Sequence, residues 1–532
     1  MEELRRLIED LSSPAAYPHK ADDLEVHHTH ISVVFLAGEY AYKVKKPLDL
    51  GFLDFTSLDL RLHYCREEIR LNRRLAAQVY LDVVPITVGS SGLVLEGDGE
   101  PVEYAVKMRR LPEGATLRER LARDGLDPSV LKDLASRIAD FHREADSNEE
   151  IARYGRWDVV AENARENLSQ SQDQVGRTVS EPVFERLGAS LETRLEQIRP
   201  LVEDRAERKI PCDTHGDLHL DHVYLFPDRP PPDDLVVVDC IEFSERFRFA
   251  DPVSDPAFLA MDLIHHGRPD LAQDFSDTYL QASGDDEGRE LFPFYRSYRA
   301  AVRGKVEGIA SAEEEVPEEE RKSSEEASRR HWLLALSELE EAGARPGLVL
   351  VSGLPGTGKS TLARGLARTA KLHLLSSDRV RKGLAGLEPD AEASAAFGEG
   401  IYTQEWTERT YGSCLQEVRE RLFRGERIVV DATFREERWR RAFLDEGLRS
   451  GLPTLLIVCR TPEEVVRDRI ARRTDDPSDA DWRIHQEVAS RWEESSPATL
   501  RFTVELRTDD TEEEVTQRAL THLRERGLAD RV

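Results

Sequence analysis

The chain has 532 residues, a formal net charge of −29 at pH 7 and five scattered cysteines without a C-x-x-C pair. This length exceeds what one hydrophobic core usually serves, so we expect two or three domains, and the acidic balance argues against broad non-specific binding to nucleic acid or anionic lipid. Because it contains no run of 18 apolar residues and no signal-peptide core, we expect a cytoplasmic protein with reduced thiols and no membrane partner, in an oligomeric state that the sequence leaves open.

Three zones follow one another along the chain. Residues 1–110 alternate short β-like runs with one amphipathic helix, Leu60–Ala77, and residues 111–344 are mostly helical. Residues 345–532 alternate strands and helices, which indicates a parallel sheet covered on both faces. We therefore predict one domain over residues 1–344, divided into lobes at residue 110, and a second domain over the remainder.

The first chemical patterns lie in the N-terminal part. Ala41–Lys45 predicts a strand with two lysines on one face. The sharper motif is His-Gly-Asp-Leu-His at residues 215–219, and the apolar run Val236–Val238 then ends at Asp239. Two carboxylates at successive strand ends, one catalytic and one on a metal, form the arrangement of kinases. The Asp217 carboxylate would orient or deprotonate a hydroxyl acceptor, and Asp239 would bind Mg²⁺.

This pattern resembles the aminoglycoside phosphotransferase family, whose loop is H-G-D-x-H-x-x-N, over roughly residues 25–300. The resemblance implies a bilobal protein-kinase-like fold of the α+β class that uses ATP and Mg²⁺. It also implies that one strand lysine pairs with the ATP phosphates, for which we choose Lys43 with Lys45 as the alternative. Glu68 on the following helix would hold that lysine, or it is a solvated helix acid. The stretch around Met108 would form the hinge over adenine, or an ordinary edge strand.

The chain departs from the family pattern at the metal-binding Asn of the loop, which is His222 here. Mg²⁺ prefers hard oxygen ligands, so the imidazole is a poor substitute in a metal set with Asp239. Either one metal is lost or Asp221 supplies an oxygen. The N-terminal domain is accordingly an active kinase, or a pseudokinase that binds nucleotide and regulates its neighbour.

The C-terminal part contains the sequence G-x-x-x-x-G-K-[ST] at Gly353–Ser360, between an apolar strand at Leu348–Val351 and a helix at Thr361–Ala370. Glycines let the backbone N–H groups wrap phosphate oxygens, Lys359 can reach the β- and γ-phosphates, and the Ser360 hydroxyl can ligate Mg²⁺. The predicted nucleotide-binding residues of this loop are Gly353, Pro355, Gly356, Thr357, Gly358, Lys359, Ser360 and Thr361.

Three further features belong with this loop. Asp378 follows the second predicted strand and is a candidate base for an acceptor hydroxyl, or a helix cap, and Arg381 one turn later would hold the acceptor or the transferred phosphoryl group. Asp431 closes an apolar strand, where an acid orients Mg²⁺ or its water, or is a turn residue. An arginine-rich helix with Arg469 and Arg472 would close as a lid over the triphosphate, or is a solvated basic face.

Together with the run Asp476–Ala480, these motifs resemble the small P-loop kinases of the gluconate kinase, zeta toxin and polynucleotide 5′-kinase type. The resemblance implies an α/β, doubly wound parallel-sheet P-loop NTPase fold. The pair Asp378 and Arg381 is most similar to the polynucleotide kinases, where these positions serve as base and acceptor clamp. The acceptor is a small-molecule hydroxyl, which the acidic balance favours, or a nucleic-acid 5′-hydroxyl end, which the pair favours.

We therefore expect an ATP-dependent phosphotransferase with ATP and Mg²⁺ as cofactors and two kinase sites. The alternative is an ATP-binding regulatory protein, with an N-terminal pseudokinase module and a C-terminal ATPase switch. Asp378 separates the two hypotheses, because an ATPase switch needs no base on the acceptor side. A role in aminoglycoside phosphorylation would rest on family analogy alone.

Overall fold

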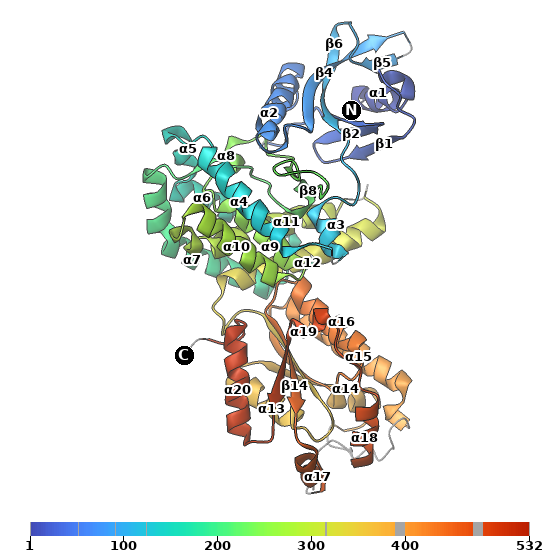
Figure 1. Cartoon of the computed structure of the whole chain (residues 1–532), viewed down its shortest axis with the longest axis vertical. Helices are drawn as coiled ribbons and strands as arrows, with labels where there is room; N and C mark the ends of the chain where they lie inside the picture. The colour runs from blue at the N-terminus through green and yellow to red at the C-terminus, as the bar shows by residue number, and fades with distance from the viewer. Residues whose placement is uncertain are drawn as a thin grey trace. The chain divides into compact units, whose positions relative to one another are not determined.

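The computed structural model describes residues 2–51, 53–90, 92–123, 125–313, 316–388, 400–471 and 482–530. The chain divides into two compact units, and the helical region contributes to both of them (Figure 1). The sequence analysis divides the chain into two consecutive domains at residue 344, and that division stays a prediction. The first unit comprises Met1–Ala161, Ile198–Asp262 and Asp270–Tyr295, and the second comprises Glu162–Gln197, Leu263–Pro269 and Arg296–Val532.

The first unit begins with a six-stranded antiparallel sheet in the order β1-β2-β3-β6-β4-β5. Helix α2 (Leu58–Ala76) starts at Ser57, whose side chain accepts a hydrogen bond from the N–H of Leu60, and it packs on β4 and β6. Helix α1 (Glu2–Leu11) buries three leucines against the same sheet. The strands are β1 (Leu24–His28), β2 (Ser32–Ala37), β3 (Tyr40–Lys45), β4 (Tyr80–Gly89), β5 (Gly92–Leu95) and β6 (Pro101–Arg109).

Helices and two short antiparallel pairs of strands follow this sheet. The pair β8 (Val223–Leu225) and β9 (Leu235–Val237) lies on either side of a turn, and β7 (Cys212–Asp213) pairs with β10 (Phe249–Ala250). Backbone hydrogen bonds from Ile241 to His215 and from Val238 to His222 hold the two loops beside each other. The helices of this region are α3 (Leu117–Ala122), α4 (Pro128–Glu144), α5 (Glu149–Tyr154), α6 (Trp157–Ser169), α7 (Glu181–Glu207), α8 (Glu245–Arg248), α9 (Ser254–His265), α10 (Pro269–Ser283), α11 (Phe292–Ala310) and α12 (Glu318–Leu339).

The second unit contains a five-stranded parallel sheet in the order β12-β13-β11-β14-β15. The central strand β11 is buried on both faces, which explains its uninterrupted apolar sequence. The strands are β11 (Gly347–Gly353), β12 (His373–Ser376), β13 (Arg427–Asp431), β14 (Thr454–Arg460) and β15 (Thr503–Arg507).

Helices cover both faces of this sheet. Val349 and Val351 share a core with α13 (Lys359–Thr369) and α20 (Glu512–Glu525), whereas Leu348 lies against Gly447 of α16 (Glu437–Arg449). The predicted doubly wound parallel sheet is confirmed, as is the predicted mixture of α+β and α/β parts. The remaining helices are α14 (Ser377–Leu384), α15 (Gln404–Phe423), α17 (Glu463–Ala471), α18 (Trp482–Ser490) and α19 (Pro497–Leu500). Over the described ranges, no helix has the length and apolar character needed to cross a membrane.

Candidate functional site

The loop between β11 and α13 has a backbone that only glycine adopts without strain. Gly353, Gly356 and Gly358 have φ values of 144°, 83° and 89°. A Cβ atom on Gly353 would lie 2.8 Å from the carbonyl oxygen of Cys459, and one on Gly356 would lie 2.8 Å from Cγ1 of Val466. The loop therefore has tight turns at its glycines, which allow backbone N–H groups to surround an anion at the start of a helix.

Oxygen ligands for a metal meet beside this loop. Asp431 ends β13 and is aligned with Val351 of the neighbouring strand β11. Burial raises the pKa of Asp431, and the charge of Lys359 and a hydrogen bond with Ser360 oppose that shift without cancelling it. The Nζ atom of Lys359 donates to the carbonyl oxygen of Leu354 at 3.1 Å. The hydroxyl of Ser360 and the carboxylate of Asp431 fit Mg²⁺, which prefers hard oxygen ligands.

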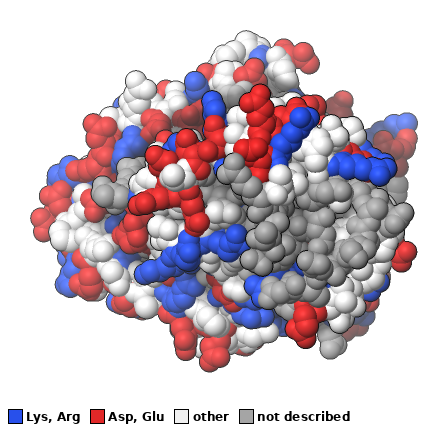
Figure 2. Space-filling model, turned by 90° about the horizontal axis from the view of Figure 1, so that it is seen from below, with Lys and Arg blue, Asp and Glu red and all other residues white. Residues whose placement is uncertain are grey.

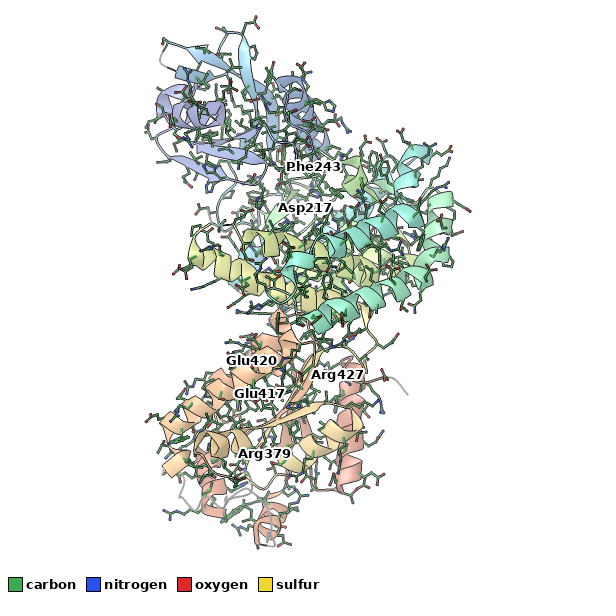
Figure 3. All side chains as sticks on the ribbon, turned by 180° about the vertical axis from the view of Figure 1, so that it is seen from behind. Asp217, Phe243, Arg379, Glu417, Glu420 and Arg427 are labelled. Atoms are coloured by element: carbon green, nitrogen blue, oxygen red, sulfur yellow. The ribbon has the colours of Figure 1, made fainter. Side chains whose placement is uncertain are left out.

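The proposed base lies at the same edge of the sheet. Ser376, the last residue of β12, is aligned with Asp431, and Asp378 follows in the first turn of α14. Figure 3 labels the next residue of that helix, Arg379. The Nζ atom of Lys382 lies 3.3 Å from Oδ2 of Asp378, and the Lys382 side chain is completely buried. The sequence analysis missed Lys382, although its i,i+4 spacing from Asp378 was a usable signal.

Arg381, three residues after Asp378, lines a cavity of about 150 Å³ together with Thr433, two residues after Asp431. Its guanidinium group lies 5.0 Å from the ring centroid of Tyr402, and its Nε is 3.4 Å from Oγ1 of Thr410. Tyr411 and Trp439 stack with their ring centroids 5.1 Å apart. Neither residue belongs to a local sequence motif. The cavity is lined by Arg381, Tyr402, Gln404, Thr407, Tyr411, Thr433, Arg435, Glu436, Trp439, Val488 and Arg491.

Arg469 of the predicted lid contacts the neighbourhood of the phosphate loop. Its guanidinium group donates to the carbonyl oxygen of Thr508 at 2.7 Å, and the Thr508 hydroxyl donates to the carbonyl oxygen of Thr357 at 2.6 Å. On the other side of the loop, Nδ1 of His485 lies 2.7 Å from the carbonyl oxygen of Pro355. The predicted residue Arg472 and the run Asp476–Ala480 lie outside the described residues.

In the first unit, four side chains predicted from separate motifs form one ion network. The Nζ atom of Lys43 lies 3.0 Å from Oε1 of Glu68 and 2.7 Å from Oδ1 of Asp239. The Nζ atom of Lys45 lies 2.7 Å from Oε2 of Glu68 and also pairs with Glu242. Although burial alone lowers it, the two carboxylates hold the pKa of Lys43 well above its ordinary value. Glu68 is therefore shared by both candidate lysines, and the sequence analysis missed Glu242.

A buried carboxylate shapes the loop that carries Asp217. Asp255 of α9 accepts hydrogen bonds from the backbone N–H groups of His215 at 2.7 Å and Gly216 at 2.9 Å. His142 of α4 lies 3.1 Å from the same carboxylate. Burial raises the pKa of Asp255, but these hydrogen bonds and imidazoles hold it below its ordinary value. The sequence analysis missed Asp255 and His142 because neither belongs to a local motif.

The imidazole of His222 lies between the two predicted acids of this loop. Its Nδ1 is 2.9 Å from the carbonyl oxygen of Asp217, and its Nε2 is 3.6 Å from Oδ2 of Asp239. Asp221 forms an ion pair with Arg118. The Asp239 carboxylate fits Mg²⁺, whereas the imidazole of His222 does not. Met108, the predicted hinge residue, lies on β6, aligned with Ala41 of β3 and Tyr80 of β4.

Comparison with known proteins finds relatives over most of the chain. Residues 348–495 match the AAA_33 family model, which describes an AAA domain. The chain is 32% identical over 468 residues to the uncharacterized protein Rv2004c of Mycobacterium tuberculosis H37Rv, covering 88% of this chain and 90% of that protein. The same values hold for MT2060 of M. tuberculosis CDC 1551 and Mb2027c of Mycobacterium bovis.

Solved structures of kinases are similar to parts of the chain. A sugar kinase from Janibacter sp. HTCC2649 is 19% identical, covers 35% of this chain and 99% of its own, and has a TM-score of 0.27. A gluconokinase from Sinorhizobium meliloti 1021 is 17% identical, covering 34% and 93%, with a TM-score of 0.25. The GDP complex of aminoglycoside 2′-phosphotransferase-IIIa is 15% identical, covering 62% and 98%, with a TM-score of 0.37.

Proposed function

We propose that this chain, which belongs to the same family as the mycobacterial proteins Rv2004c, MT2060 and Mb2027c, is an ATP-dependent phosphotransferase that acts on a hydroxyl acceptor. The observation that carries the proposal is the meeting of three elements at one edge of the parallel sheet. The phosphate loop follows β11, Asp431 ends β13, and Asp378 follows β12. This edge is where parallel α/β sheets bind their ligands.

Each group at this edge has a defined task in phosphoryl transfer. The backbone N–H groups of the loop hold the phosphates, and Lys359 leaves the carbonyl oxygen of Leu354 to pair with the β- and γ-phosphate oxygens. Ser360 and Asp431 would hold Mg²⁺, which supplies charge neutralisation on the phosphate oxygens when bound. Asp378 accepts the proton of the acceptor hydroxyl, and the buried ammonium group of Lys382 holds that carboxylate in position.

The cavity beside Arg381 supports a small acceptor. Its volume is about 150 Å³. Arg381 and Arg491 line it together with the stacked rings of Tyr411 and Trp439, which suits a hydroxyl compound that also carries an anionic group, whereas Arg435 is paired with Glu436. On the face shown in Figure 2, outside the grey residues, basic side chains lie among acidic ones. A small molecule is therefore favoured over a long nucleic-acid strand.

A second nucleotide site in the first unit is a further candidate function. The pairing of Lys43 with Glu68 and Asp239 favours it, because a lysine held by a helix acid positions ATP phosphates in kinases. Asp217, labelled in Figure 3, would then serve the acceptor of this second site.

The test is transfer of labelled γ-phosphate from ATP to sugars, aminoglycosides, nucleosides and oligonucleotides with 5′-hydroxyl ends. Lys359→Ala should lower transfer by the P-loop site by about 100-fold or more, because it removes a charge that stabilises the transition state. Asp217→Ala should abolish phosphoryl transfer by the first unit and leave transfer by the P-loop site unchanged. Lys322→Ala, at an exposed lysine of α12, is the matched control. Label that reaches only water with every acceptor would reject the proposal in favour of an ATPase switch.

A further inference from the structure

Two carbonyl oxygens of the phosphate loop are held by side chains from elements outside the loop. Nδ1 of His485, on α18, lies 2.7 Å from the carbonyl oxygen of Pro355. The hydroxyl of Thr508, which follows β15, lies 2.6 Å from the carbonyl oxygen of Thr357. Both residues are buried, with exposed fractions of 8% and 3%. Pro355 and Thr357 each precede a glycine of the loop.

The acceptor fixes the direction of each of these hydrogen bonds. A carbonyl oxygen has no proton to give, so the Nδ1–H of His485 donates to Pro355 and the hydroxyl of Thr508 donates to Thr357. The Thr508 hydroxyl also lies 3.2 Å from the carbonyl oxygen of Arg460, but its single proton goes to the closer acceptor. Each of the two loop carbonyl groups therefore has a buried donor that sets where it points.

The peptide plane carries this direction to the next N–H group. A trans peptide bond is planar, and its C=O and N–H groups point in opposite directions. Because the carbonyl of Pro355 faces His485, the N–H of Gly356 points away from that ring, and the N–H of Gly358 likewise points away from Thr508. Within the part of the chain that the structure describes, neither N–H has a protein acceptor. Both glycines are left-handed, with φ of 83° and 89°, a conformation that builds anion-binding nests.

The ring of His485 has a second contact, which is purely a packing contact. It stacks on Trp482 of the same helix, with the ring centroids 4.9 Å apart and 11° between the planes. Packing at this position needs a flat ring, whereas holding the loop carbonyl needs an N–H group. The two roles therefore predict different responses to substitution.

We propose that His485 is a positioning residue of the P-loop nucleotide site and that Thr508 supports it in this role. By holding the two carbonyl groups, these side chains aim the N–H groups of Gly356 and Gly358 at a phosphate anion before the nucleotide arrives. Donors that are already aimed bind an anion more tightly, because binding then costs no backbone reorganisation. The inference rests on the proposed nucleotide site of the second unit and is independent of the acceptor.

Calorimetric titration of the full-length chain with a non-hydrolysable ATP analogue and Mg²⁺ tests this role. His485→Phe keeps a flat ring beside Trp482 and removes the donor, so it should weaken binding about tenfold, which corresponds to one lost hydrogen bond. His485→Asn removes the ring but keeps an N–H near the position of Nδ1, so its affinity should stay within about threefold of the wild type. Tight binding by His485→Phe together with weak binding by His485→Asn would assign the residue a packing role and overturn the proposal.

A second pair of variants makes the same comparison at Thr508. Thr508→Val keeps the shape and removes the hydroxyl, so it should weaken binding about tenfold, whereas Thr508→Ser keeps the hydroxyl and should bind like the wild type. This pair decides the matter if the thermal midpoint shows that His485→Phe does not fold. His373→Phe, at an exposed position of β12, is the control. A wild type that does not bind the analogue would overturn the proposed function itself. Binding by the wild type with unchanged affinity in His485→Phe and Thr508→Val would overturn only this assignment.

Discussion

The Nζ atom of Lys43 lies 2.7 Å from the Oδ1 atom of Asp239, although 196 positions separate the two residues in the chain. The same ammonium group lies 3.0 Å from Glu68, which also holds Lys45 at 2.7 Å. Lys43 and Lys45 meet one carboxylate because residues two apart on a strand point to the same face. Glu68 thus pairs with both lysines of the sheet, and Asp239 and Glu242 supply further negative charge to Lys43 and Lys45.

Removing that glutamate should strongly destabilise the first unit. Glu68→Ala leaves Lys43 paired with Asp239 and the buried Lys45 paired with Glu242, each with one carboxylate fewer, so we expect the free energy of unfolding to fall by about 3–5 kcal/mol. Glu67→Ala is the matched control, because its pair with Arg70 on the same helix is more exposed and contributes less than about 1 kcal/mol. Urea unfolding followed by fluorescence measures both variants. Equally small losses of stability in Glu68→Ala and Glu67→Ala would show that Glu68 does not compensate the lysine charges.

Replacing Gly353 and Gly383 of the second unit by alanine should change the free energy of unfolding in opposite directions. Gly353→Ala places a Cβ atom 2.8 Å from a backbone oxygen at a φ of 144°, and we expect a loss of about 1–3 kcal/mol in the free energy of unfolding. Gly383→Ala, within α14 and with open space around its Cβ position, should gain about 0.5–1 kcal/mol from helix propensity. Denaturant midpoints compare the two. A neutral Gly353→Ala would contradict the strained loop described here.

A histidine pair, of which His331 is buried and His265 is partly buried, should make the second unit sensitive to acid. The rings of His265 and His331 stack with centroids 3.8 Å apart. Burial, and then the charges of His331, His266, Arg330 and Arg303, hold the pKa of His265 well below its ordinary value of 6.5. The unfolded state therefore binds more protons once the pH falls below 6.5, so stability is present above that pH and is lost as the pH drops.

Unfolding midpoints about one pH unit above and below 6.5 measure this effect. His265→Phe keeps an aromatic ring and should flatten the pH dependence relative to the wild type. His522→Phe on α20 controls for the loss of one imidazole. The same slope in wild type and His265→Phe would assign the acid sensitivity to other groups.

Removing the carboxylate of Asp378 should impair phosphoryl transfer without impairing nucleotide binding. Asp378→Asn removes the proposed base and should lower transfer to the acceptor by about 10²–10⁴-fold, while ATP binding by the loop remains. Arg379→Ala, at the adjacent exposed position, is the control. Rapid-quench transfer and equilibrium binding of an ATP analogue provide the two measurements. Intact hydrolysis together with no detectable acceptor in either protein would support the ATPase switch instead.

The P-loop part was the more predictable from sequence. The strand, loop and helix around Gly353–Ser360 and the strand Arg427–Asp431 lie where their patterns indicated, because glycine turns and unbroken apolar runs are local demands on the backbone. The acceptor cavity was less predictable. Tyr411 and Trp439 come from two helices on one side of the sheet, and their stacking depends on packing that no short motif encodes.

The sequence by itself determined which chemistry-bearing residues are present: a phosphate loop, its two nearby acids, and the acids and lysines of the N-terminal motifs. The family resemblance already implied that Glu68 holds Lys43, and tertiary structure decided the rest of the grouping. It added Asp239 to that pair, and it placed the ring of His222 between the backbone of Asp217 and the carboxylate of Asp239. The physical reason is that turn conformation is set by neighbours in the chain, whereas ion pairs and metal ligands depend on sheet register and on loops that return from distant segments.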